Sequence, residues 1–308
     1  MYEGFDLSQY VPVLSVTFLA VTCFLASTVP FVAIYLFRKK FRAEYRALFY
    51  GIADYLSLEY MLCRVAWLLL LLIPVFQTSS AAYIIVGLIL ASIIMEGGRY
   101  FMIGLMKKQE ISFGGLFLFA TGIFAANSLI NVLVQAFQSF VIAITINDTG
   151  LDVLAQEAGE NALAMLQSVE PMLTCSPYIY LMSGLDLFVN LLFHISVTVL
   201  LYAVYTGRLQ KYYLAAVMGL RFVYELPGYC YSYRIFITNA FLAEAISVVI
   251  AAATAYLAYH VLTVEMPDEL SSLTPTEEKS PFPDFNANVR KGSIRSNANI
   301  LAGKNDEE

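Results

Sequence analysis

Seven apolar stretches, separated by short polar connections, occupy most of the chain between residues 13 and 262. Each is about 20 residues or longer, which is the length that an α-helix needs to cross a lipid bilayer. The second and sixth stretches contain charged residues, so their edges are less well defined than those of the others. The predicted spans are residues 13–37, 48–76, 81–106, 113–144, 177–205, 211–230 and 236–262. The pattern therefore predicts an all-α, polytopic membrane protein built as a bundle of seven transmembrane helices.

The composition supports a membrane class. Of 308 residues, 59% are hydrophobic and 14% charged, against about 25% charged residues in a typical soluble domain. The connections are short, so residues 1–266 are expected to form one transmembrane domain. Residues 267–308 are rich in Ser, Pro, Asn, Glu and Lys, and such a segment buries too little apolar surface to fold. We expect it to be a disordered cytosolic tail.

The positions of Lys and Arg predict the orientation in the membrane, because basic connections stay on the cytosolic side. Residues 38–46 hold five basic residues, and Lys107, Lys108, Arg208 and Lys211 follow the third and fifth spans. The connections at 77–80 and 145–176 hold none. We therefore expect a lumenal or extracellular N-terminus and a cytosolic C-terminus. The acidic connection 145–176 also predicts a short amphipathic helix over residues 151–166.

Several ionisable and amide side chains lie at membrane depth. Glu96 and Arg99 are three residues apart on the third span, which places them on one face of the helix. A charge inside the bilayer costs about 2.5–3.5 kcal/mol on insertion scales, so such residues are expected to face protein and to pair. Others follow on later spans: Asn127, Ser128, Asn131, Asp186, Asn190, His194, Arg221, Glu225 and Glu244. The pattern predicts a bundle with a polar interior.

Four functional classes use such an interior. A coupled transporter is not favoured, because the chain shows neither a repeated half nor a pair of Gly/Pro-broken spans. A seven-helix receptor is suggested by Arg99-Tyr100, but Arg99 lies about two helical turns before Lys107, and the seventh span lacks an Asn-Pro-x-x-Tyr pattern. An intramembrane protease and a non-catalytic scaffold remain to be compared.

A protease needs a group that activates water and one that stabilises the oxyanion. Glutamate-dependent prenyl-protein peptidases use a Glu-Glu dyad and intramembrane histidines, whereas this chain reads Met95-Glu96 and has one deep histidine, His194. The paired aspartate motifs of aspartyl intramembrane proteases do not occur either. The four Cys and two His show no metal-ligand spacing, so no metal or other cofactor is predicted. This leaves a non-catalytic scaffold, with a degenerate glutamate-type protease and, less favoured, a receptor as alternatives.

Four separated stretches resemble the Aph (anterior pharynx defective) subunit of γ-secretase. Glu96-Gly-Gly-Arg99 followed by Lys107-Lys108 is similar to its Glu-x-x-Arg-Phe segment ending in Leu-Leu-Lys-Lys. Gly122-Ile-Phe-Ala-Ala126 resembles its Gly-x-x-x-Gly stripe, and Ser128-Leu-Ile-Asn-Val-Leu133 resembles the Ser-x-Ile-Asn-x-Leu segment that follows the stripe. Ser176-Pro-Tyr-Ile-Tyr-Leu-Met-Ser183 resembles the opening of its fifth span, at the right distance from His194. The chain departs from the family at Leu118 and Ala126 in the stripe and lacks its second buried histidine.

The resemblance implies a scaffold that does no chemistry of its own. Its partners would be a presenilin-like aspartyl protease, nicastrin and the presenilin-enhancer subunit, within the lipid bilayer and without nucleic acid. The complex would cleave single-pass membrane proteins, including those of Notch signalling, in the endoplasmic reticulum, Golgi and plasma membrane. The residues implied in a structural polar cluster are Glu96, Arg99, Asn131, His194 and Glu225, and those implied in helix packing are Gly122, Ala126 and Ser128.

Overall fold

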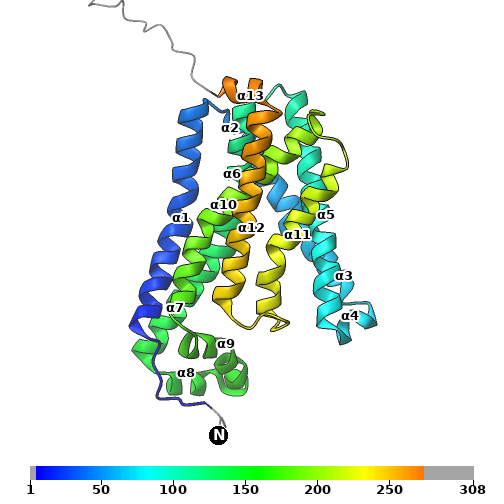
Figure 1. The fold of residues 1–308 in the computed structure, drawn as a ribbon. Helices are drawn as coiled ribbons and strands as arrows, with labels where there is room; N and C mark the ends of the chain where they lie inside the picture. The colour runs from blue at the N-terminus through cyan, green and yellow to red at the C-terminus, as the bar shows by residue number, and fades with distance from the viewer. Residues whose placement is uncertain (1–4, 274–308) are drawn as a thin grey trace, which may run out of the picture. The chain divides into compact units, whose positions relative to one another are not determined.

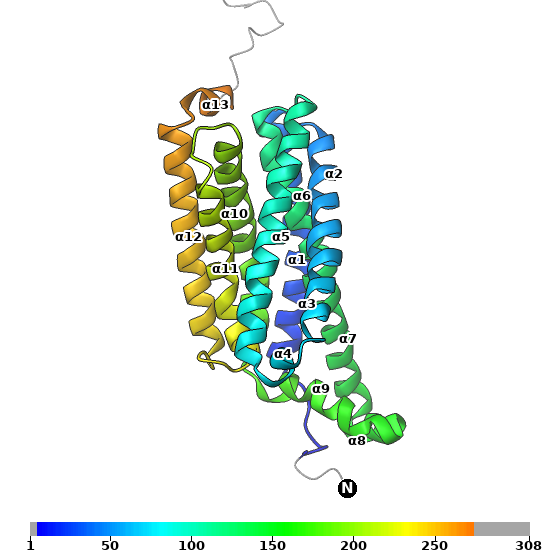
Figure 2. The ribbon, with the colours of Figure 1, turned by 90° about the vertical axis from the view of Figure 1, so that its right-hand side faces the viewer.

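The computed structural model describes residues 5–273, which form a bundle of long helices along a common axis (Figures 1 and 2). None of these residues belongs to a β-strand. Two π-helical segments, η1 (Tyr55–Cys63) and η2 (Ser128–Leu133), continue α2 into α3 and α6 into α7, and a 3₁₀ turn, η3, covers Gly159–Asn161. The α-helices are α1 (Val13–Phe41), α2 (Tyr45–Asp54), α3 (Arg64–Leu70), α4 (Pro74–Thr78), α5 (Ser80–Lys108), α6 (Phe113–Asn127), α7 (Val134–Thr149), α8 (Leu151–Ala158), α9 (Ala162–Thr174), α10 (Tyr178–Tyr205), α11 (Tyr213–Ser232), α12 (Ala240–Val264) and α13 (Pro267–Ser272).

Five helical segments in the described part of the chain are long and apolar enough to cross a membrane. They are Val13–Phe41, Ser80–Lys108, Phe113–Thr149, Tyr178–Tyr205 and Ala240–Val264. The prediction of an all-helical polytopic membrane protein is therefore confirmed. Helices also occupy the second and sixth predicted positions, as α2–η1–α3 and α11. Neither of these two is among the five segments, so the count of seven spans stays a prediction.

The basic helix ends gather at one end of the bundle. Arg38, Lys39 and Lys40 lie in the last turn of α1, and Lys107 and Lys108 in that of α5, where cations interact favourably with the negative end of the helix dipole. These ends lie opposite the end that carries α8, α9 and the start of α1 (Figure 1). The connections that are basic in the sequence thus lie together at one end of the folded bundle.

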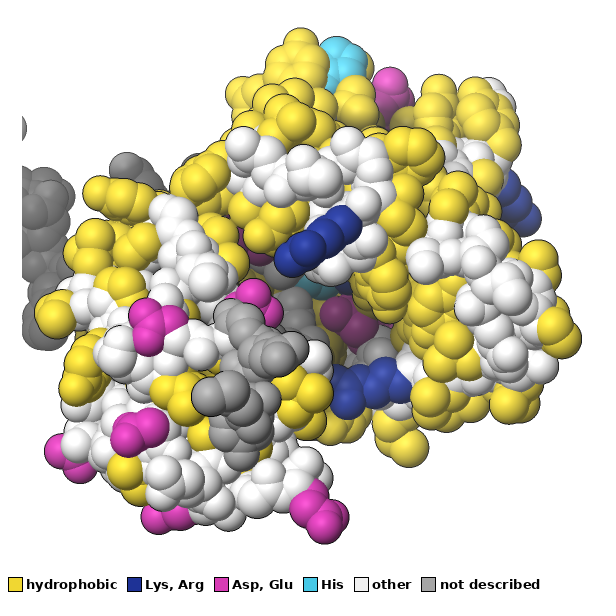
Figure 3. Space-filling model, turned by 90° about the horizontal axis from the view of Figure 1, so that it is seen from below, with side chains coloured by type: hydrophobic (Ala, Val, Ile, Leu, Met, Phe, Trp, Pro, Cys, Tyr) yellow, Lys and Arg dark blue, Asp and Glu magenta, His cyan; other side chains and the backbone are white. Residues whose placement is uncertain are grey.

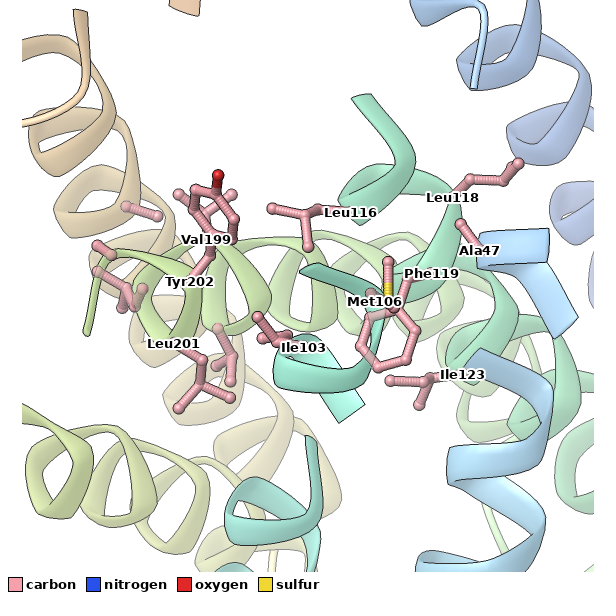
Figure 4. Close-up of a cluster of buried hydrophobic side chains, with 14 of the residues drawn as sticks. Ala47, Ile103, Met106, Leu116, Leu118, Phe119, Ile123, Val199, Leu201 and Tyr202 are labelled. Atoms are coloured by element: carbon pink, nitrogen blue, oxygen red, sulfur yellow. The ribbon is translucent and has the colours of Figure 1, made fainter. Parts of the chain in front are cut away.

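The main hydrophobic core fills the space between α2, α5, α6 and α10. Figure 4 shows part of it, where Phe119 and Ile123 of α6 lie beside Met106 of α5 and near Ala47 of α2. Ala126, one of the predicted packing residues, belongs to the same core. Ser128 donates a hydrogen bond of 2.9 Å to the carbonyl oxygen of Ala26, which fastens η2 to α1. These predicted packing residues therefore contact other helices of this chain.

Glycines bring α2 and α6 into backbone contact. A Cβ placed on Gly122 would lie 3.1 Å from the Cα of Gly51 and would overlap the carbonyl oxygen of Leu48. Glycine has no side chain to separate two helices, so it allows this approach. The small-residue position that the sequence singled out at Gly122 thus packs against a second glycine that the sequence pattern did not indicate.

A second, smaller core lies under the acidic connection. Here the structure has two short helices, α8 and α9, where one amphipathic helix was predicted over residues 151–166. Their apolar sides bury Leu151, Ala155 and Leu166 together with Val11 of the N-terminal segment. Asn147 fixes this segment, because its side chain accepts a hydrogen bond from the amide of Val11 (2.7 Å) and donates one to the carbonyl of Val11 (2.9 Å).

The expected boundary after residue 266 falls just before α13. Glu269 of this helix accepts a hydrogen bond of 2.8 Å from the hydroxyl of Tyr202, and Asp268 lies 3.6 Å from Arg208. The predicted disordered tail lies, from residue 274 onward, outside the described residues.

Replacing Gly122 by Ala is expected to destabilise the bundle by about 1–3 kcal/mol, since the new methyl group meets a backbone carbonyl that has no room to move. The matched control is Gly219→Ala on α11, where an added Cβ meets nothing within 4 Å. This control is expected to be neutral or to stabilise by up to about 1 kcal/mol through helix propensity. Thermal unfolding in detergent measures both. Equal losses at the two positions would contradict the close approach of α2 and α6.

Candidate functional site

A group of charged side chains, here called the ion-pair core, lies inside the bundle between η1, α5, α10 and α11. Its members are Glu59, Glu96, Arg99, His194, Arg221 and Glu225. Arg99 is 1% exposed, and Glu96 and His194 are fully buried. Nη1 of Arg99 lies 3.1 Å from Oε2 of Glu96, and Nη2 lies 3.0 Å from Nδ1 of His194. One guanidinium thus joins α5 to α10.

The contact with Arg99 fixes the protonation of His194. A guanidinium has five N–H donors and no acceptor, so Nδ1 of His194 must accept this hydrogen bond. The imidazole is then neutral and carries its proton on Nε2, an atom that is buried and makes no hydrogen bond with the described residues. Neither ring nitrogen therefore presents a lone pair to a further group.

Arg221 forms the second half of the ion-pair core. Its Nη2 lies 2.5 Å from Oε1 of Glu225, one turn further along α11, and 3.6 Å from Oε2 of Glu59 on η1. Its guanidinium also lies 5.8 Å from the ring centroid of Phe193. Breaking such a buried pair on one side leaves an uncompensated charge, which is strongly destabilising. The pairs therefore fix η1, α11 and α10 relative to one another.

Glu59, a member of this core, and Asp54, which lies near it, are absent from the cluster predicted from the sequence. Asp54 is buried at the end of α2 and interacts electrostatically with Arg99, Glu96 and Glu59. Asp54 lies where the helix changes from α to π geometry and Glu59 lies within the π segment, so a period of 3.6 residues does not predict which way they face. The available signal was the presence of acidic residues inside an apolar stretch.

A second polar region of the bundle is a cavity of about 410 Å³, which lies among α1, η2, α7, α10, α11 and α12. Asp186 of α10 and Glu244 of α12 both line it, and their carboxyl groups lie close enough to each other to interact. Two ionised carboxylates have acceptors only and repel each other, so a hydrogen bond between this pair forms when one of the two carries a proton. The other side chains of the lining that carry hydroxyl or amide groups are Thr22, Asn131, Gln135, Ser139, Tyr180, Ser183, Tyr231 and Ser247.

The polar interior is visible from the end of the molecule that carries α8 and α9. Figure 3 shows a hollow there, with basic side chains near its rim and acidic and histidine side chains inside it. Along α10, Asn190 stands four residues after Asp186 and four before His194, which places the three on one face of the helix. A polar stripe thus runs along α10 between the cavity and the ion-pair core.

The structure brings together part of the predicted polar cluster. Glu96, Arg99 and His194 contact one another, while Glu225 pairs with Arg221. Asn131 lies elsewhere: its Nδ2 donates to the hydroxyl of Tyr55 and to Oδ1 of Asn127, both at 2.8 Å, and its Oδ1 lies 3.4 Å from Arg64.

Residues 25–247 match the model of a protein family described as YhfC intramembrane metalloprotease. The chain belongs to the YhfC family. The match and the apolar helices together make the chain an integral membrane protein. No curated protein and no solved structure matches it.

The family assignment corrects the resemblance to Aph, which was wrong. Because the YhfC family is described as a protease, the finding also contradicts what the resemblance implied about function. This concerns the scaffold function, the lack of catalytic activity in this chain, the association with Notch signalling, and the partners presenilin, nicastrin and presenilin-enhancer subunit. The physical reason is that the quoted motifs are general: a Glu-x-x-Arg pair neutralises itself on any membrane helix, and small residues every four positions allow any two helices to approach. The degenerate glutamate-type alternative receives no specific support either.

The family description implies a metal ion, and the donor set of the described residues does not fit one. Both ring nitrogens of His194 are occupied by hydrogens, one its own and one from Arg99. The other histidine, His260, is exposed on α12 and stacks on Tyr256. The four cysteines are free, and no group of three or more Asp, Glu, His or Cys ligands occurs within residues 5–273.

The YhfC-family chain is therefore expected to purify with far less than one equivalent of zinc or another transition metal per chain. Elemental analysis of protein prepared without chelator measures this, with the variant His194→Ala as a comparison. Near-stoichiometric metal that disappears in His194→Ala would contradict the neutral, Arg99-bonded imidazole.

Replacing Arg99 by Met is expected to destabilise the fold by about 3–5 kcal/mol, because it leaves the buried carboxylate of Glu96 without its partner. The double variant Arg99→Met/Glu96→Gln removes that lone charge and should regain part of the loss. Lys108→Met, at the exposed end of the same helix, is the control and should change little. Thermal unfolding in detergent gives the three values, and a double variant no better than Arg99→Met would argue against the ion pair.

Proposed function

We propose that this YhfC-family protein is an intramembrane peptidase whose reacting groups are the carboxyl pair Asp186 and Glu244. The family description supports peptide-bond hydrolysis in a membrane. The single observation that carries the choice of residues is a pair of carboxyl groups that lie next to each other at the wall of a cavity. Both residues lie on helices that are long and apolar enough to span the bilayer.

Two carboxyl groups that hold one proton between them are suited to acid–base catalysis. The ionised carboxylate takes a proton from a water molecule, whose oxygen attacks the carbonyl carbon of the peptide bond. The protonated carboxyl gives its proton to the departing nitrogen as the C–N bond breaks. Water is thereby divided between the new carboxyl and amine ends, and the pair again holds one proton.

The ion-pair core is less suited to this role. Glu96 is fully buried against Arg99 and is not among the residues that line the cavity. A carboxylate already paired with a guanidinium is a weak base for water. We assign the ion-pair core the role of holding η1, α5, α10 and α11 in place, so that α10 presents Asp186 to α12.

The substrate class follows from the cavity's surroundings. Its wall combines hydroxyl and amide side chains with apolar residues such as Leu19, Val132 and Met182. A polypeptide segment within or against the membrane matches this combination, because its apolar side chains fit the apolar wall and its backbone finds hydrogen-bond partners among the polar groups. We therefore infer a membrane-embedded polypeptide as the substrate.

The orientation follows from the basic helix ends. We infer that the end with Lys39 and Lys107 faces the cytosol and that the end with α8 and α9 faces the lumen or exterior, as the positive-inside rule predicts. Residence in the endoplasmic reticulum, Golgi and plasma membrane depended on the Aph resemblance. The location in a membrane does not depend on that resemblance, because the family match and the apolar helices support it.

Purified full-length chain in nanodiscs, reconstituted with a set of single-span polypeptides, tests the proposal by mass spectrometry of the products. Asp186→Asn and Glu244→Gln are each expected to lower the cleavage rate at least about 100-fold, the usual contribution of a general acid or base. Glu265→Gln, at the exposed end of α12, is the charge-matched control and should cleave normally. The rate should also fall on both sides of a pH optimum, where the pair gains or loses its shared proton.

Two outcomes would overturn the proposal. Full cleavage by both pair variants would remove Asp186 and Glu244 from the chemistry. Binding of the single-span polypeptides without any cleavage by the wild-type chain, at any pH tested, would replace hydrolysis by recognition.

A further inference from the structure

A separate cavity of about 650 Å³ lies at the basic end of the bundle, where α1 ends and the chain turns into α2. Its lining divides into three basic residues, Arg38, Lys39 and Arg42, and three aromatic ones, Phe31, Tyr35 and Tyr45, completed by Ile34 and Ala43. Among the described residues, no Asp or Glu is part of this lining. We call it the interfacial pocket.

The geometry of the interfacial pocket brings its positive charges to one side. The guanidinium of Arg38 lies 4.1 Å from the ring centroid of Tyr45, and Nζ of Lys39 lies 5.7 Å from that of Tyr35. Arg42 has a φ of 50° and ends α1 in the left-handed conformation. The chain therefore reverses around the pocket, and the aromatic rings hold the long basic side chains near its mouth through cation–π contacts.

The apolar side of the pocket continues along a membrane-spanning helix. Phe31 and Tyr35 are 63% and 61% exposed, and both lie within the candidate span Val13–Phe41. Such exposed rings on a membrane helix face the acyl chains of lipids. Basic residues just beyond the end of a span attract anionic head groups, and here both features occur within one cavity.

We propose that the interfacial pocket binds an anionic phospholipid, with its phosphate at Arg38, Lys39 and Arg42 and its acyl chains along Phe31 and Tyr35. The chemistry that selects this ligand is a negative phosphate joined to an apolar chain. Free phosphate would use the basic side alone and leave the exposed aromatic wall without a role. This site is independent of the carboxyl pair, which lies among other residues of the bundle.

The test uses the full-length chain and native mass spectrometry of its lipid complexes after mixing with phosphatidylglycerol or phosphatidylcholine. Phosphatidylglycerol is expected to bind more tightly. The double variant Arg38→Gln/Lys39→Gln should weaken its binding by about 25-fold, or about fivefold for each basic residue. The control Lys40→Gln/Arg46→Gln removes the same charge from neighbouring positions outside the pocket and should weaken binding by much less.

Three results would overturn the proposal. Equal weakening by both double variants would indicate diffuse attraction to the whole basic end. Equal binding of phosphatidylglycerol and phosphatidylcholine would remove the role of charge. Displacement of the lipid by glycerol 3-phosphate at equal concentration would show that the phosphate alone is recognised and that Phe31 and Tyr35 contribute nothing.

Discussion

The arrangement of the helices depends on the neutralisation of two guanidinium groups inside an apolar bundle. Arg99 and Arg221 are almost completely buried, and a charge in that position is tolerated only with partners of opposite charge or with hydrogen-bond acceptors. Arg99 finds them on its own helix and on α10, and Arg221 on its own helix and on η1. Each arginine thus connects two elements that are far apart in the sequence. The hydrophobic contacts around them have less directional preference, so these pairs select the mutual positions of the helices.

Whether a feature could be predicted from the sequence depends on how far apart along the chain its interacting residues lie. The five long apolar helices and the Glu96–Arg99 pair depend on local sequence, and the structure contains both. The contact of Arg99 with His194 and the pairing of Glu59 with Arg221 join different helices, and no spacing along one helix reveals such a pair. The same holds for Asp186 and Glu244, which the sequence placed at membrane depth without showing that they face each other.

The wrong family assignment has a related cause. The charged and small-residue stretches that suggested Aph satisfy requirements that the bilayer places on all polytopic proteins: paired charges, small residues at close crossings and basic residues at helix ends. Agreement between two sequences at such positions therefore reflects the lipid environment that both share more than a common ancestor. The family match spans residues 25–247 and therefore draws on positions throughout the bundle. The same chain departs from its family's description in its donor set, since His194 turns a nitrogen toward an arginine.

The two π-helical segments add a property that straight helices lack. η1 and η2 lie near one another, joined where Asn131 bonds to Tyr55. A π turn contains one residue more than an α turn, and its return to α geometry would rotate everything beyond it by about 100°. In η1 such a slip would swing Arg64 away from Asn131, and in η2 it would turn Gln135 and Ser139 out of the cavity wall. The π turn of η2 thus lets Gln135 and Ser139 line the cavity, a position that an unbroken α-helix of the same sequence would not give them.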